Sequence, residues 1–292
     1  MEYCNNLDER ICLNNGVRMP ALGLGTFLVQ DPDVCRLNVS AAINAGYRMI
    51  DTAAQYRNET AVAEGIRQSG IKREDIFITT KVWLQYCGYD NVRTGLENSL
   101  KRLGTDYVDL YLIHWPFVDL TGTWKAMEEL VDEGKIRSIG VCNCSIEQLE
   151  EILGMCRIKP VLNQVECHPI NQNKELRSYM EKHDILMQAW GILGRAKSET
   201  LDNGVINDLA TKYSKSPAQI ILRWGLQEGM SVIPKAVSIE HLVMNSRIFD
   251  FELTQEDMDK IRSVDTGKRL VSRTDPSDPA ARDRLINMTF DI

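Results

Sequence analysis

The sequence predicts an α/β fold, a single (β/α)8 TIM barrel with extra helices and a C-terminal arm, and three observations support this. Short β-rich apolar runs alternate with amphipathic helical stretches along all 292 residues. Runs such as 107–113 are almost continuously apolar, which is typical of parallel strands buried on both faces. No linker or low-complexity tract divides residues 1–292, and α/β barrels of about 250 residues fold as one domain.

Eight strands are predicted, and each is followed by a helical pattern. The strands are expected at 22–25, 49–51, 77–81, 108–113, 138–141, 161–166, 186–190 and 231–233. The helices are expected at 34–45, 59–69, 89–103, 123–133, 146–155, 174–183, 205–213 with 217–227, and 239–245. A further helix at 254–263 begins with Thr254 and Asp257, which are spaced like a capping box.

An open, doubly wound sheet is the alternative to a barrel. That fold normally places a turn with three glycines between the first strand and helix, with an acidic residue about 20 positions later. Gly23-Leu24-Gly25-Thr26 lacks the third glycine, so the barrel is favoured.

The residues beyond Gly267 form a C-terminal arm. Only 285–292 is apolar, and basic and acidic side chains offset each other along the arm. This segment can be an ordered arm or a loose one, and a solvated, mixed-charge tail is favoured.

Composition limits the classes of partner. Lys and Arg total 34 against 41 Asp and Glu, so the net charge of −7 gives no general attraction to nucleic acid or anionic membranes. The first residues have no apolar signal segment, and no apolar run is long enough to span a bilayer. We expect a cytoplasmic monomer that binds a small molecule.

The 8 cysteines are scattered without a Cys-x-x-Cys pair, which indicates reduced thiols. Cys144, Cys167 and His168 do not have the paired spacing of a structural zinc site, so no metal is expected.

Four polar residues fall at consecutive strand ends, where barrel enzymes carry their reactive groups. Asp51 ends the second strand, Tyr56 lies in the loop that follows, Lys81 ends the third and His114 ends the fourth. Each has an ordinary structural explanation by itself, such as capping, ring packing or a satisfied core histidine. Their joint placement favours a reactive site.

These residue types can deliver a proton to a carbonyl group. A tyrosine is a poor acid near neutral pH unless a cation stabilises its phenolate, and Lys81 can supply that charge. Asp51 can hold the lysine charged, and His114 can orient a carbonyl oxygen.

The motifs around these residues resemble the aldo-keto reductase family over nearly the whole chain. The resemblance is to short-loop microbial members, similar to diketogluconate reductases and prostaglandin F synthase-like enzymes. The matching stretches are 23–26, 46–53 with Tyr56 and Asn58-Glu59, 80–83, 112–116, 134–141, Asn163-Gln164-Val165-Glu166 with His168-Pro169, and Ile233-Pro234-Lys235.

The resemblance implies an NADPH-dependent reductase that converts aldehydes and ketones to alcohols. Tyr56 would be the general acid, Lys81 and Asp51 would tune it, and His114 would orient the substrate. Asn143 and Gln164 would contact the nicotinamide, on which Trp190 would stack. The implied cofactor contacts are completed by Thr26, Asp51, Cys142, Leu193, Lys235, Val237, Ser238, His241 and Asn245.

Several positions depart from the family pattern. Cys142 replaces a serine that usually helps to hold the carboxamide, and Gly191-Ile192-Leu193 replaces a Ser-Pro-Leu run. Ala236 replaces a serine, and His241 stands where an arginine usually binds the 2′-phosphate. NADPH is therefore expected to be preferred by less than usual, with NADH also usable.

The substrate pocket is expected to be lined by Phe27, Trp83, Trp115 and His114. The loop after the fourth strand is short, which favours small aldehydes, 2-oxoaldehydes and sugar-like ketones. Two alternatives remain. One is a regulatory subunit of the same fold that binds cofactor with little turnover, and the other is a phosphate-handling barrel isomerase that uses Lys235.

Overall fold

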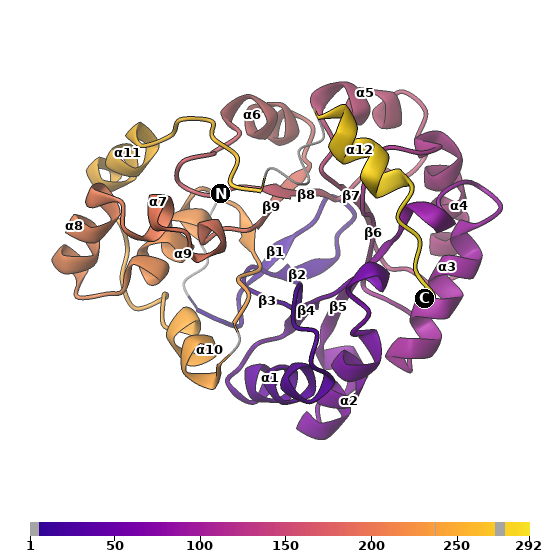
Figure 1. The fold of residues 1–292 in the computed structure, drawn as a ribbon, viewed down its shortest axis with the longest axis horizontal. Coiled ribbons are helices and arrows are strands. Elements are labelled where there is room, and N and C mark those ends of the chain that lie inside the picture. Colours follow the sequence, from indigo (N-terminus) through magenta and orange to yellow (C-terminus); the bar gives the residue numbers. More distant parts are fainter. Residues whose placement is uncertain (1–5, 237, 272–277) are drawn as a thin grey trace.

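The computed structural model describes residues 6–236, 238–271 and 278–292. Eight parallel strands pair in chain order from β3 to β10, and helices surround them (Figure 1). The strands are β3 (Leu24–Gly25), β4 (Met49–Asp51), β5 (Phe77–Val82), β6 (Leu110–Ile113), β7 (Ile139–Cys142), β8 (Leu162–Glu166), β9 (Leu186–Trp190) and β10 (Ser231–Val232). The predicted eight-stranded barrel is confirmed.

Hydrogen bonds between the first and last strands close the barrel. The backbone N–H of Gly23 donates to the carbonyl of Val232, and the N–H of Val232 donates to the carbonyl of Ala21. Gly25 donates to Pro234. Closure leaves no open sheet edge, and it places the end of β10 beside the end of β3.

The outer layer contains the predicted helices and some that the sequence pattern did not indicate. The sequence periodicity predicted most helix boundaries to within a few residues of those in the structure. The helices are α1 (Pro32–Asn44), α2 (Glu59–Ser69), α3 (Val92–Leu103), α4 (Leu120–Asp132), α5 (Ile146–Leu153), α6 (Lys174–Lys182), α7 (Ser198–Leu201), α8 (Gly204–Tyr213), α9 (Pro217–Gln227), α10 (Ile239–Ser246), α11 (Gln255–Ser263) and α12 (Pro279–Ile286).

Capping residues fix several helix starts. Ser145 and Ser216 each accept from the backbone N–H three residues later, and the glutamine at that position bonds back to the cap. Thr254 and Asp257 form the capping box predicted from their spacing.

An antiparallel hairpin of β1 (Arg10–Cys12) and β2 (Arg18–Pro20) precedes the barrel and was not predicted. Leu13 and Met19 are buried in one cluster with Met49 and Phe77, which begin β4 and β5. The hairpin therefore covers the amino-terminal end of the barrel interior. Its strands are too short for sequence alternation to reveal them.

The C-terminal arm is ordered over residues 279–292, although most of its side chains there are exposed. This segment contains α12, and the residues after it form hydrogen bonds with the β5–α3 loop. The Trp83 indole donates to the carbonyl of Met288 over 2.7 Å, and the Gln85 amide donates to the carbonyl of Phe290 over 2.9 Å. Arg273 and Asp275 lie outside the described residues.

Among the described helices, none is both long enough and apolar enough to cross a bilayer.

Candidate active site

Strand alternation places the polar strand ends inside the barrel mouth. Asp51 follows the interior residue Met49 by two positions, and Lys81 follows the interior residue Phe77 by four. Because side chains alternate between the two faces of a strand, both polar groups lie above the apolar interior. The lysine and aspartate are almost fully buried, at 0% and 2% side-chain exposure.

Lys81 joins the predicted residues into one cluster. Its ammonium group donates to Asp51 Oδ1 over 2.6 Å, to the carbonyl of Thr52 over 2.9 Å and to the Tyr56 hydroxyl over 3.3 Å. All three ammonium donors are thus directed at acceptors, one of which is the proposed acid.

A short 3-10 turn, Ala54–Tyr56, presents the tyrosine to this cluster. Arg57 adopts a left-handed conformation directly after it, with φ of 58°. The Asn58 amide fixes the loop by donating to the carbonyls of Thr26 and Val29, while Thr52 donates its hydroxyl proton to Asn58 Oδ1. The loop is therefore held by buried hydrogen bonds rather than by its own propensity.

The buried ion pair sets the charge of the cluster. Burial alone would lower the pKa of Lys81, but the charge and hydrogen bond of Asp51, with smaller contributions from Tyr56 and Cys142, together outweigh it, so the pKa is raised and the ammonium persists. Burial raises the pKa of Asp51, opposed by Lys81 and by the Gln164 amide. Burial also raises the pKa of Tyr56, although Lys81 favours its phenolate. The tyrosine consequently keeps its proton at neutral pH.

His114 faces the tyrosine as a neutral ring. Its centroid lies 5.6 Å from that of Tyr56 and 5.2 Å from that of Trp83, edge to face in both cases. Burial, together with the charge of Lys81, lowers the pKa of His114 well below its ordinary value. Its Nδ1 has no hydrogen-bond partner within the described part of the chain. A neutral imidazole whose ring lies edge to face with the tyrosine can bond a ligand oxygen.

A chain of polar side chains extends from Asp51 across the barrel interior. Gln164 Nε2 donates to Asp51 Oδ2 and to Gln188 Oε1, at 2.7 Å each, and Gln188 donates to Ser231 over 3.0 Å. Gln188 was not singled out in the sequence, although a glutamine within an apolar strand is a detectable signal.

Asn143 and Trp190 form a second polar unit at the mouth. Asn143 donates from Nδ2 to the carbonyl of His114 over 3.1 Å, and the Trp190 indole donates to Asn143 Oδ1 over 3.0 Å. Asn143 itself is left-handed, with φ of 59°. The Cys142 thiol lies 3.9 Å from Gln164 Oε1 and is fully buried. Asn143 directly follows β7, Gln164 lies within β8 and Trp190 ends β9, so the three residues come from neighbouring strands.

The other predicted cofactor residues that the structure describes follow β3, β9 or β10. Thr26 donates its hydroxyl proton to the carbonyl of Asp51 over 3.0 Å, and Leu193 is half-buried. Lys235 and His241 are exposed, whereas Asn245 is 4% exposed. Ser238 caps α10 by accepting from the backbone N–H of His241. Val237 lies outside the described residues.

The predicted pocket walls differ in their burial. Phe27 is half-buried, and its ring centroid lies 4.9 Å from that of Tyr56. Trp83 is buried under the arm, with Phe290 packed edge to face on it at 5.7 Å. Trp115 is also buried, stacked between His114 and Phe117. The sequence did not indicate the contribution of Phe290, because the arm lacked periodicity.

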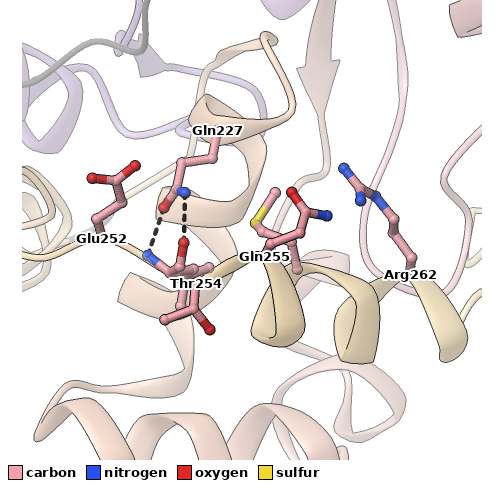
Figure 2. A pocket seen from close by; sticks show the side chains of 7 residues that line it. Gln227, Glu252, Thr254, Gln255 and Arg262 are labelled. Atoms are coloured by element: carbon pink, nitrogen blue, oxygen red, sulfur yellow. Dashed lines mark hydrogen bonds between the residues drawn. The ribbon is translucent and has the colours of Figure 1, made fainter.

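A separate pocket lies beside α11 and contains none of these residues (Figure 2). Two of its polar side chains are engaged by neighbouring residues. Gln227 pairs through both ends of its amide with the backbone of Leu253, and Arg262 pairs with Glu228 and Asp259. In the described ranges, no cluster of three or more potential metal ligands occurs.

Comparison with known proteins agrees with the geometry. Residues 21–266 match the family described as Aldo/keto reductase family. The chain is 48% identical to the glyoxal reductase of Bacillus subtilis (strain 168) over 266 residues, covering 91% of this chain and 96% of that protein. It is 41% identical to the methylglyoxal reductase DkgA of Escherichia coli (strain K12), covering 89% and 94%.

A solved structure gives the same assignment. The crystal structure of MGS-M4, an aldo-keto reductase enzyme from a Medee basin deep-sea metagenome library, superimposes with a TM-score of 0.86 at 41% identity. The match covers 88% of this chain and 96% of that one. The chain is therefore an oxidoreductase that belongs to the aldo/keto reductase family.

Proposed function

We propose that the protein reduces small aldehydes and ketones to alcohols, with NADPH as reductant and Tyr56 as general acid. The observation that carries this proposal is the position of the Lys81 ammonium, which bonds to both Asp51 and the Tyr56 hydroxyl. A cation held against a tyrosine hydroxyl stabilises the phenolate that remains after the proton is donated.

Members of this family use a nicotinamide cofactor, and the amide groups at the mouth fit one. Both N–H groups of Gln164 are engaged, and its Oε1, which accepts from the Cys142 thiol over 3.9 Å, keeps a second lone pair for a carboxamide N–H. Asn143 retains one amide N–H for a carboxamide oxygen, and Trp190 offers a half-buried ring for stacking. When bound, the reduced nicotinamide supplies the hydride that the carbonyl carbon accepts.

The residues of the chain manage the proton and the orientation. Neutral His114 donates a hydrogen bond that orients the carbonyl oxygen toward Tyr56. Tyr56 gives its proton to that oxygen as the carbonyl carbon is reduced, and the alcohol leaves. The phenolate, stabilised by Lys81, is then reprotonated from water. One aldehyde, one hydride equivalent and one proton yield one alcohol.

The preference for NADPH rests on the region around β10 and α10. Lys235 is exposed just after β10 and can pair with a 2′-phosphate. His241 is exposed at the start of α10 and can contact the same phosphate. An imidazole gives less charge than an arginine would, so the preference over NADH is modest.

The names of the relatives support 2-oxoaldehydes as substrates. Proteins 48% and 41% identical to this chain are called glyoxal reductase and methylglyoxal reductase. The short segment between His114 and α4 is compatible with such small carbonyl compounds.

We further propose that the protein works as a monomer in the cytosol. The four residues Asp51, Tyr56, Lys81 and His114 come from one chain. The described cysteines are all free thiols, which is typical of a reducing compartment.

The test is spectroscopic. NADPH and then NADH are mixed with the protein and with glyoxal, methylglyoxal or glucose, and the loss of reduced nicotinamide absorbance is followed. Turnover with NADPH ahead of NADH is expected. Binding of NADPH without turnover on any carbonyl would instead indicate the regulatory subunit, an alternative that the relatives' names do not favour.

A further inference from the structure

A buried glutamine, Gln188, lies in the interior of the barrel. It belongs to β9 and pairs in register with Gln164 on β8 and with Ser231 on β10. All three side chains are buried. A buried amide costs free energy unless its polar groups are paired, so an apolar side chain would fill the same space with fewer requirements. What Gln188 contributes must therefore lie in its hydrogen bonds.

The orientation of the Gln188 amide is set by a neighbour that carries no proton. Its Nε2 donates to Ser231 Oγ over 3.0 Å and lies 3.8 Å from the sulfur of Met49. A thioether can accept a hydrogen bond but cannot donate one, so the amide nitrogen rather than the oxygen faces Met49. Gln188 Oε1 is consequently turned toward Gln164, from which it accepts over 2.7 Å.

The Gln164 amide is held at both of its N–H groups. Its Nε2 donates to Asp51 Oδ2 and to Gln188 Oε1, each over 2.7 Å. The Asp51 carboxylate forms an ion pair with Lys81 at 2.6 Å, and an ionised carboxylate only accepts hydrogen bonds. Both N–H groups are thus directed into the barrel interior. The remaining atom, Oε1, faces the Cys142 thiol at 3.9 Å, next to Asn143.

The bond to Gln188 adds what the bond to Asp51 cannot supply alone. The terminal torsion of a glutamine side chain is broad, so an amide held by one bond can pivot about it. A second bond from the same nitrogen fixes the plane of the amide. Without Gln188, one N–H of Gln164 would also be left unpaired in the interior, which favours a different side-chain position.

We propose that Gln188 is a positioning residue that holds the Gln164 amide with its Oε1 facing the carboxamide N–H of the nicotinamide. This inference rests on the proposed function, in which Gln164 contacts that carboxamide. Gln188 acts through Gln164 and does not itself touch the cofactor. Its influence is therefore confined to the carboxamide end and does not extend to the adenosine or phosphate groups.

Two cofactor analogues separate this role from a general effect on the fold. The 3-acetylpyridine analogue of NADP+ has a methyl group in place of the carboxamide NH₂, so it offers no N–H to Gln164. The fragment 2′-phospho-ADP-ribose lacks the nicotinamide ring altogether. Dissociation constants for NADP+ and for both analogues are measured by calorimetry in the wild type, Gln188→Met and Gln188→Glu. Methionine has the unbranched shape of glutamine without its amide.

The measured quantity is the ratio of the dissociation constant of the acetylpyridine analogue to that of NADP+. This ratio should exceed one in the wild type and fall about 3- to 10-fold in Gln188→Met, as expected for loss of one neutral hydrogen bond. Binding of 2′-phospho-ADP-ribose should stay within about twofold. Gln188→Glu should restore the ratio, because burial keeps its carboxyl group protonated and its carbonyl oxygen can accept from Gln164.

Gln227→Met is the matched control. Gln227 is also buried, and both ends of its amide bond to the backbone of Leu253, in the pocket that contains none of the candidate site residues (Figure 2). This variant should keep the wild-type ratio. If Gln188→Met does not fold, Ser231→Ala removes the acceptor that orients Gln188, and it should lower the ratio in the same direction by a smaller factor.

An unchanged ratio in the folded variant would overturn the inference, as would a wild type that binds NADP+ and the acetylpyridine analogue equally well. An equal loss of affinity for 2′-phospho-ADP-ribose would also overturn it, because Gln188 would then support the fold in general. Failure of the wild type to bind NADP+ at all would instead count against the proposed function.

Discussion

At the residue scale, the reaction depends on which groups hold protons at neutral pH. Burial raises the pKa of Tyr56 and lowers that of His114, while Asp51 keeps Lys81 charged. At neutral pH the site therefore contains a protonated Tyr56, a neutral His114 and a charged Lys81. Each of these states is the one that carbonyl reduction uses.

The pH profile should reflect this arrangement. Because the pKa of Tyr56 is raised, the proton is available throughout the neutral range, and kcat for reduction should be constant from pH 6 to 9. Alcohol oxidation needs the phenolate, so its rate should increase with pH across that range. Steady-state rates in both directions check this, and a reduction rate that falls above pH 7 would contradict it.

The preference between NADPH and NADH also depends on individual residues. His241→Arg places a permanent charge beside Lys235, so NADPH should bind about tenfold more tightly, the equivalent of one charged hydrogen bond. NADH binding should change little. Fluorescence titrations of both cofactors measure this, with His183→Arg as a control that adds the same charge just after the C-terminal end of α6. An unchanged NADPH affinity would remove His241 from the phosphate site.

At the element scale, the sequence predicted the barrel strands but not the position of the C-terminal arm. Strands such as β5 are recognisable because they are buried along their whole length. The arm residues 288–292 bond mainly through their backbone carbonyls to Trp83, Gln85 and Tyr86. Backbone bonds leave no trace in the side-chain pattern, so the arm could not be placed from the sequence.

The arm should therefore affect substrate binding more than cofactor binding. Gln85→Ala removes two hydrogen bonds to Phe290, whose ring packs on Trp83 beside His114. We expect KM for aldehydes to rise severalfold, since the lost bonds contribute about 1 kcal/mol each. NADPH affinity should be unchanged. Gln255→Ala on α11 is the control, and equal kinetics in both variants would argue against a role for the arm.

At the scale of the whole molecule, the fold depends on joining β3 to β10. The sequence predicted the barrel through its repeated units, but it could not show that Gly25 is required where the barrel closes. A Cβ at Gly25 would lie 2.7 Å from the carbonyl oxygen of Ile233. That oxygen belongs to the backbone, so it cannot move aside as a flexible side chain could.

Gly25→Ala should consequently destabilise the protein by about 1–3 kcal/mol, as expected for overpacking. Gly204→Ala is a matched control, because a Cβ there meets nothing within 4 Å. Urea unfolding of both variants measures the difference. Equal midpoints would show that the barrel does not close through this contact.

The whole account depends on proton delivery by Tyr56 from the cluster that Lys81 organises. The most direct measurement is the single-turnover rate of NADPH oxidation by methylglyoxal in the wild type and in Tyr56→Phe, each saturated with NADPH. The account predicts a loss of about 10²- to 10⁴-fold in Tyr56→Phe, with NADPH affinity retained. A variant that keeps more than half of the wild-type rate would contradict it.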